Sequence, residues 1–413
     1  MFSFVLWALL LGQNTSVTQA APRALNNHLR EDVEGWIKTG EHQDFPWRIH
    51  INKPVLTFQQ RMVVKVTATI DAAVLQSQSI KRDLVFIVKV ADGTGNWVPD
   101  ESFVPQRLDA SLGRDTNLEM ESEVLLKPGK YTIATMVYDS VLNQHNLSLS
   151  SISVELLKKD PFPTLFEKAP VAEFVRGEVY GQQVLSSTLP EILVRSRSPI
   201  QLDLILDLST REQQVPIVYY NSPMGGRRSM PPHFRPLNDK TYITSLLQAA
   251  SVLGALHPEH GCARFSSVDV LKKQDFGPVP TSLLDWHSVF DHELGAGKDT
   301  ISVSALENRT DLAKYFLSSF KDMTQDAHCA PNAERVVVLL SHGLHLPDGQ
   351  QKVQADICGC KIYYLRLNDT AMGSDDLKSM LSPLAPKIMD FHDPTQLRKR
   401  IAELIEQIQS AAQ

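Results

Sequence analysis

Acidic and hydroxylic side chains follow an apolar run of leucine and isoleucine near the middle of the chain. The run covers residues 201–206, too short for a stable isolated helix, and with Pro199 before it the pattern predicts a strand buried on both faces. Ligands of open α/β sheets bind beyond the carboxyl ends of the central strands. Asp207, Ser209 and Arg211 therefore lie where we expect a binding site.

The cysteines all lie in the second half of the chain, at positions 262, 329, 358 and 360. In an exported protein they are candidate disulfide partners. The segments at Cys329 and at Cys358-Gly-Cys360 precede strands that we expect to lie side by side, so we predict a disulfide between Cys329 and either Cys358 or Cys360. Buried free thiols are the alternative. The Cys358-Gly-Cys360 spacing does not match a zinc knuckle.

Other chemistry-bearing patterns are weaker. The stretch from His257 to Cys262 brings metal-ligand residue types together, but Pro258 indicates a turn, so we favour a histidine at a helix end beside a structural cysteine. His292-Glu293 lacks the second histidine of a metalloprotease helix. The sequence also contains neither the nucleophile elbow of hydrolases nor a phosphate-binding glycine-rich loop.

The elements that position the first cluster alternate between helical spacing and short apolar runs, which predicts an α/β, doubly wound parallel sheet from residue 199 onward. A long insert at 216–236 contains five prolines and the basic pair Arg227 and Arg228. The expected helices are 241–256, 311–323 and one beginning at Asp393-Pro394; the expected strands are 262–271, 301–306, 335–340 and 361–367.

The first half of the chain has a different pattern. After a polar stretch through Asp44, about seven short β-rich segments between turn signals predict an all-β sandwich of the immunoglobulin or fibronectin kind over 45–157. We expect a recognition or spacer module without clustered histidines or carboxylates. Two prolines at 161 and 163 then break the strand pattern, so residues 158–198 are expected to form a connector with some strand of its own, for example at 191–195.

The order of elements after residue 199 resembles a von Willebrand factor type A (vWA) domain. In that family a metal-ion-dependent adhesion site combines a strand ending in Asp-x-Ser-x-Ser, a threonine before a later helix, and a Thr-Asp-Gly turn. The matching positions here are Asp207-Leu-Ser209-Thr-Arg211, Thr310 and Ser341-His342-Gly343. The additional sandwich is similar to secreted bacterial proteins that pair a vWA domain with an immunoglobulin-like module.

Two departures change what this resemblance implies. Mg²⁺ or Mn²⁺ needs oxygen ligands, which Asp207, Ser209 and Thr310 would supply. Arg211 and His342 stand where the family has a serine and a carboxylate, so the site is degenerate. We expect no bound metal and hypothesise that the Arg211 guanidinium takes the metal's place beside Asp207; a Mg²⁺ or Mn²⁺ site is the alternative.

The whole chain has 413 residues with 47 acidic and 41 basic side chains, a balance that argues against a nucleic-acid-binding protein. Residues 1–21 resemble a secretory signal peptide, with a buried amino-terminal helix as the alternative, and no later segment is apolar enough to span a membrane. We therefore expect a secreted or periplasmic protein with a sandwich domain at 45–157, a connector at 158–198 and a vWA-like domain at 199–413.

The expected function is non-enzymatic binding or adhesion. The partner would be a protein or a surface polymer, recognised through the loops that carry Asp207, Ser209, Arg211, Thr310 and His342. One alternative is metal-dependent adhesion with atypical ligands. Another is a hydrolase that uses His342 or His345 with a partner that the sequence does not identify.

Overall fold

The computed structural model groups the chain into two compact units. Unit 1 comprises residues 1–51, 66–122 and 130–152, and unit 2 comprises 52–65, 123–129 and 153–413. The predicted signal peptide lies outside the described residues, and within the described residues no helix is both long and apolar enough to cross a membrane. The structure describes residues 22–71, 73–74, 82–108, 117–175, 190–209, 220–221, 227–228, 240–294, 311–325, 332–344, 346, 352–353, 359–368 and 375–411.

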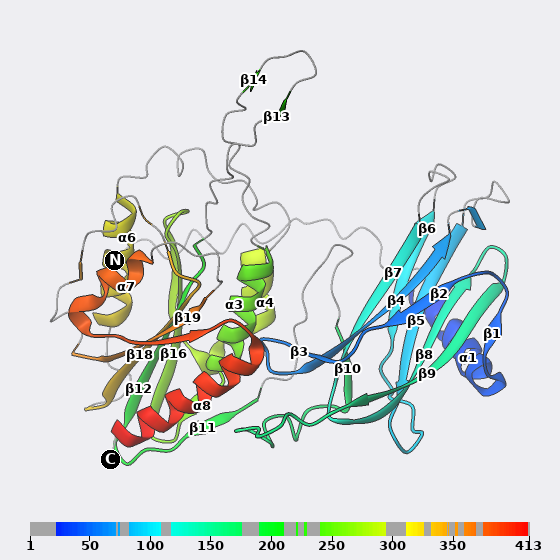
Figure 1. Cartoon of the computed structure of the whole chain (residues 1–413). Coiled ribbons are helices and arrows are strands. Elements are labelled where there is room, and N and C mark those ends of the chain that lie inside the picture. The colour runs from blue at the N-terminus through cyan, green and yellow to red at the C-terminus, as the bar shows by residue number, and fades with distance from the viewer. Residues whose placement is uncertain are drawn as a thin grey trace. The chain divides into compact units, whose positions relative to one another are not determined.

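Two five-stranded sheets occupy the first part of the chain (Figure 1). In β4 buried positions alternate with partly exposed ones, and Val64, Val66 and Ala68 are fully buried, which is the pattern of a strand with one face on a core. One sheet has the order β1(His42–Gln43), β9(Gln144–Val154), β8(Gly129–Asp139), β5(Arg82–Ala91), β6(Ser102–Leu108). The other has the order β10(Ala172–Phe174), β7(Asn117–Leu126), β4(Met62–Asp71), β2(Arg48–Ile51), with β3(Val55–Leu56) also paired to β4.

A helix that the sequence does not predict, α1(Pro22–Thr39), precedes the first strand. Leu29 and Val33 of this helix are one helical turn apart and pack with Ile87, Met136 and Leu147 of the sheet. The sequence indicates only a polar stretch through Asp44. The helix forms because its few apolar residues share one face, and burying that face on the sheet compensates for the polar composition of the rest.

The six-stranded sheet of unit 2 carries the first predicted site. Its order is β17-β16-β12-β18-β19-β20, in which β12 pairs parallel with both β16 and β18. Every residue of β12 is buried, as the sequence predicts for this strand. The strands are β17(Gln274–Pro280), β16(Gly261–Asp269), β12(Ile200–Asp207), β18(Glu334–Ser341), β19(Lys361–Leu367) and β20(Lys387–Phe391).

Helices contribute to a core on each face of this sheet. Leu202, Leu204 and Leu206 of β12 point into a cluster with the apolar residues of α3, α4 and α8, whereas Ile205 points into a second cluster with α6 and α7. The helices are α3(Lys240–Leu253), α4(Trp286–Leu294), α6(Leu312–Gln325), α7(Asp376–Met380) and α8(Pro394–Ala411).

The predicted fold class, a sandwich followed by a Rossmann-like, vWA-type parallel domain, is wrong as a description of this chain. Of the residues that the structure describes, 44% are in strands and 27% in helices, and they form several antiparallel sheets. Even in the six-stranded sheet, the edge strand β17 runs antiparallel to β16. The sequence does not predict this strand, which contains Gly277, Pro278 and Pro280, but proline is tolerated in an edge strand, where one row of backbone N–H groups needs no partner.

Short strands also lie inside the expected connector. β10 pairs antiparallel with β7, and β11(Ile192–Val194) pairs parallel with β15(Leu256–Pro258). The expected strand at 301–306 lies outside the described residues. In the proline-rich insert, the described residues form the short pair β13(Tyr220–Asn221) and β14(Arg227–Arg228).

Candidate functional site

Four polar residues at the carboxyl ends of β12 and β18 form one hydrogen-bonded group, hereafter the Asp207 cluster: Asp207, Ser209, Ser341 and His342. The parallel register of the two strands pairs Leu206 with Leu340 and so places Asp207 beside Ser341. Ser209 donates its backbone N–H and its hydroxyl to Asp207 Oδ1, over 3.0 and 2.5 Å. The Ser341 hydroxyl donates to Asp207 Oδ2 over 2.7 Å.

The same hydroxyl groups hold the chain that follows each strand. The Val270 N–H donates to Ser209 Oγ and the Gly343 N–H donates to Ser341 Oγ, each over 2.9 Å. Asp207, Ser209 and Ser341 are fully buried. The cluster therefore ties three strand ends, those of β12, β16 and β18, to a single carboxylate.

His342 completes the cluster from the loop after β18. Its Nε2 lies 2.6 Å from the Ser209 carbonyl oxygen and its Nδ1 lies 2.6 Å from the Gly343 carbonyl oxygen. Both ring nitrogens of His342 thus face backbone carbonyl oxygens. Burial raises the pKa of Asp207, and a positive charge on His342 opposes that effect.

A second polar network begins next to the cluster. Burial raises the pKa of Tyr364 well above its ordinary value, and its hydroxyl donates to Asp375 Oδ2 over 3.0 Å. Arg366 donates to the same oxygen over 3.1 Å and binds both oxygens of Asp390, over 2.8 and 3.0 Å. A side-chain hydrogen bond between Tyr364 and Ser341 joins this network to the cluster, so charged and hydroxyl groups link the carboxyl-end edge of the sheet from β12 to β20.

The structure brings together three of the predicted site residues, Asp207, Ser209 and His342. Arg211 and Thr310 lie outside the described residues, so the hypothesis of an arginine in the metal position stays a prediction, as does the Mg²⁺ or Mn²⁺ alternative. In the described arrangement Asp207 and Ser209 are fully buried and His342 is 3% exposed. These three side chains are therefore enclosed by the protein and are not exposed at its surface.

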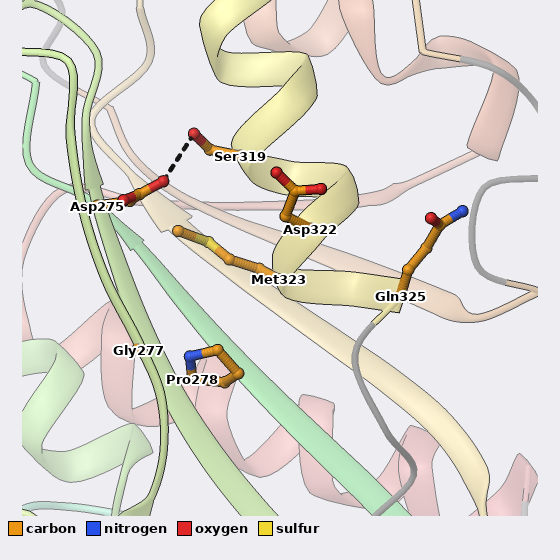
Figure 2. A pocket seen from close by; sticks show the side chains of 7 residues that line it. All are labelled: Asp275, Gly277, Pro278, Ser319, Asp322, Met323 and Gln325. Carbon is orange, nitrogen blue, oxygen red and sulfur yellow. Dashed lines mark hydrogen bonds between the residues drawn. The ribbon is translucent and has the colours of Figure 1, made fainter. Parts of the chain in front are cut away.

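A pocket of about 420 Å³ lies between β17 and α6, on the edge of the sheet (Figure 2). The Ser319 hydroxyl donates to Asp275 Oδ2 over 3.1 Å across it. Carboxylates on both walls suit a polar or positively charged group. The sequence does not predict this pocket, because it does not predict the strand β17 that forms one of its walls. It is lined by Asp275, Gly277, Pro278, Ser319, Asp322, Met323 and Gln325.

Unit 1 contains a histidine and carboxylate cluster, although we expected none in the sandwich. His42 and Asp44 lie at β1 and His145 lies on β9, with one potential metal-ligand atom from each within 4.8 Å of the others. A backbone hydrogen bond from His145 lowers the pKa of Asp44, and burial lowers the pKa of His145. The sequence gives little signal for this cluster, because His145 is about 100 positions away from the other two residues.

The described cysteines, Cys262 and Cys360, are both disulfide-bonded. Cys360 belongs to the predicted disulfide set, and Cys262 does not. Cys329 and Cys358 lie outside the described residues. The disulfide of Cys262 forms at the first residues of β16, next to the central strand β12.

Comparison with known proteins gives no assignment. No protein-family model and no curated protein matches the chain. A putative ApaA protein from Bordetella pertussis is 12% identical, covering 28% of this chain and 96% of that one, with a TM-score of 0.18.

Two enzymes are among the other structural matches. A family 123 glycoside hydrolase from Clostridium perfringens is 10% identical, covering 84% of this chain and 72% of that one, with a TM-score of 0.23. A glycosyl hydrolase family 2 member from Bacteroides cellulosilyticus is 10% identical, covering 81% and 36%, with a TM-score of 0.20. Scores this low carry no argument about function.

Proposed function

We propose that this chain is an exported, non-enzymatic binding protein. It recognises a protein or a surface polymer through the loops at the carboxyl-end edge of the six-stranded sheet, and it does so without a bound metal. The observation that supports the proposal is the Asp207 cluster, in which each functional group is committed to holding a neighbouring segment of chain.

The arrangement favours binding over catalysis for a physical reason. A general base needs a nitrogen or oxygen that reaches the substrate. Both nitrogens of His342 contact backbone carbonyl oxygens, and both oxygens of Asp207 accept hydrogen bonds from serine side chains. These groups instead fix the backbone at the base of the loops, and a fixed loop loses less conformational entropy when a partner binds.

The test is a binding survey with a matched pair of variants. The mature chain is applied to a glycan array that includes peptidoglycan fragments, and to immobilised fibronectin and collagen, with and without added Mg²⁺. We expect saturable binding to at least one probe, unchanged by Mg²⁺. Ser341→Ala removes one hydroxyl from the cluster and leaves Asp207 Oδ2 and the Gly343 N–H without this partner, so we expect it to weaken binding by at least about tenfold.

Ser379→Ala is the control, because Ser379 is an exposed serine outside the cluster. The proposal is wrong if no probe binds, if Ser341→Ala binds as well as Ser379→Ala, or if the chain hydrolyses the probe that it binds. Circular dichroism of each variant separates loss of binding from loss of fold.

A further inference from the structure

The sandwich of unit 1 carries side chains whose types and geometry suit a transition-metal ion. His42 and Asp44 are exposed at the short edge strand β1, and His145 is half-buried near the start of the neighbouring strand β9. The His42 Nε2 atom lies 2.8 Å from Asp44 Oδ1. One ligand atom from each of the three residues lies within 4.8 Å of the other two.

The backbone that carries these side chains is fixed by buried hydrogen bonds. Asn146, which is fully buried, accepts the N–H groups of Asp44 and Phe45 over 2.8 and 3.1 Å and donates to the Phe45 carbonyl oxygen over 2.7 Å. The His145 N–H donates to Asp44 Oδ2 over 2.8 Å. Asp44 Oδ2 is thereby oriented by the backbone of the opposite strand.

Aromatic stacking orients the two imidazole rings. The Trp36 ring of α1 stacks on His145 at 4.2 Å and 12°, and His145 stacks on His42 at 4.5 Å and 30°. The Tyr138 ring packs against Trp36, with 5.3 Å between the two ring centroids. The two imidazoles are thus stacked face to face, with Trp36 packed on the far face of His145, while His42 stays exposed to solvent.

We propose that His42, Asp44 and His145 bind a divalent transition-metal ion, with Zn²⁺ as the best fit. Two imidazole nitrogens and one carboxylate oxygen form a ligand set of the kind that holds Zn²⁺ with a water in the remaining position. Zinc–ligand distances are about 2.0–2.2 Å. The ion would therefore replace the hydrogen bond between His42 and Asp44 and draw the His145 ring nitrogen inward.

The bound ion would fasten the amino-terminal segment to the sheet. β1 consists of two residues and pairs with β9 only at positions 42 and 43. A metal ion bound by His42, Asp44 and His145 would join the β1 segment to β9 in addition to this two-residue pairing. Metal binding would then stabilise unit 1, because the site exists only in the folded chain.

The test is titration of Zn²⁺ into the metal-free mature chain by calorimetry, with thermal unfolding of the same samples. We expect one saturable Zn²⁺ site and a rise in the unfolding midpoint. His42→Gln and Asp44→Asn each remove one ligand from the exposed side of the cluster, so each should weaken Zn²⁺ binding by at least about tenfold. His145→Gln should do the same, but it also changes the stack with Trp36.

The matched control is His50→Gln, since His50 is an exposed histidine on β2 of the same unit. It should leave binding and the Zn²⁺-dependent rise in the midpoint unchanged. The proposal is overturned if the wild type binds no Zn²⁺ at saturable stoichiometry, or if His42→Gln and Asp44→Asn bind Zn²⁺ as the control does. Unfolding midpoints without metal show whether each variant folds.

Discussion

Asp203, in the middle of β12, carries one of the most heavily paired charges of unit 2. Its Oδ1 accepts from Arg264 Nε over 2.7 Å and its Oδ2 from Arg335 Nε over 2.8 Å, and its side chain is 4% exposed. Asp203→Ala would leave two buried guanidinium groups without their common partner. We expect a loss of about 3–5 kcal/mol in the free energy of unfolding, measured with urea at neutral pH.

The exposed pair of Asp83 and Arg107 is the comparison for that prediction. Their side chains are 47% and 78% exposed, so water screens the interaction. Asp83→Ala should cost less than about 1 kcal/mol. Equal losses in the two variants would mean that burial does not control the contribution of Asp203.

For single residues, the sequence predicts where in the fold a side chain lies better than it predicts which atoms that side chain contacts. That Asp207 and Ser209 share an edge with His342 follows from strand order. Which of their atoms face solvent depends on side-chain rotamers, and here the hydroxyls turn inward onto the carboxylate. The proximity of His42 to His145 depends on β1 pairing with β9, and a two-residue strand has no periodicity to detect.

At the scale of single elements, two glycines give predictions of opposite sign. Gly261, at the start of β16, has φ +132°, and a Cβ atom there would lie 1.9 Å from the Ile200 carbonyl oxygen of β12. Gly261→Ala should therefore cost about 3 kcal/mol or more, because the close pairing of the two strands must open. Gly35 lies in α1 with open space around its Cβ position. Gly35→Ala should stabilise the chain by about 0.5–1 kcal/mol in the same urea experiment.

The helix α8 allows a prediction about pH. A hydrogen bond from Arg400 lowers the pKa of Glu403 from its ordinary value of 4.5. The stability from this contact is therefore present above pH 4.5 and is lost as pH falls through the lower folded-state pKa. Glu403→Gln should be less stable than the wild type by up to about 0.5 kcal/mol at neutral pH and low salt. Unfolding curves should converge in acid; a constant difference across pH would contradict this prediction.

The elements that the sequence predicted well have strong periodicity or long apolar runs. β12, β18 and β19 are runs of buried aliphatic and aromatic residues, and α8 has a clear apolar face. β17 was missed because glycine and proline suit an edge strand as well as a loop. β20 was missed because Lys387–Phe391 has only two buried residues among five. The pairing direction of edge strands depends on tertiary contacts that local pattern does not encode.

At the scale of the whole molecule, the two units differ in cysteine content. All four cysteines follow residue 153 and belong to the sequence of unit 2, and the described ones, Cys262 and Cys360, are both bonded. Reduction should lower the unfolding midpoint of unit 2, with a loss of about 2–5 kcal/mol for each disulfide, and leave that of unit 1 unchanged. Calorimetry with and without reductant measures both. A single unfolding transition whose midpoint falls on reduction would contradict this prediction and would mean that the two units unfold together.

The segment 52–65 belongs to unit 2 although unit 1 surrounds it in the sequence. Phe58 packs edge-on against Phe391, and the Gln60 side chain donates to the Pro394 carbonyl oxygen, 334 positions later in the chain. At a translation rate of about 5–20 residues per second, the ribosome needs roughly 20–70 s to supply those partners. During that time Phe58 has no native site, so the nascent chain presents an apolar segment to chaperones well before unit 2 is complete.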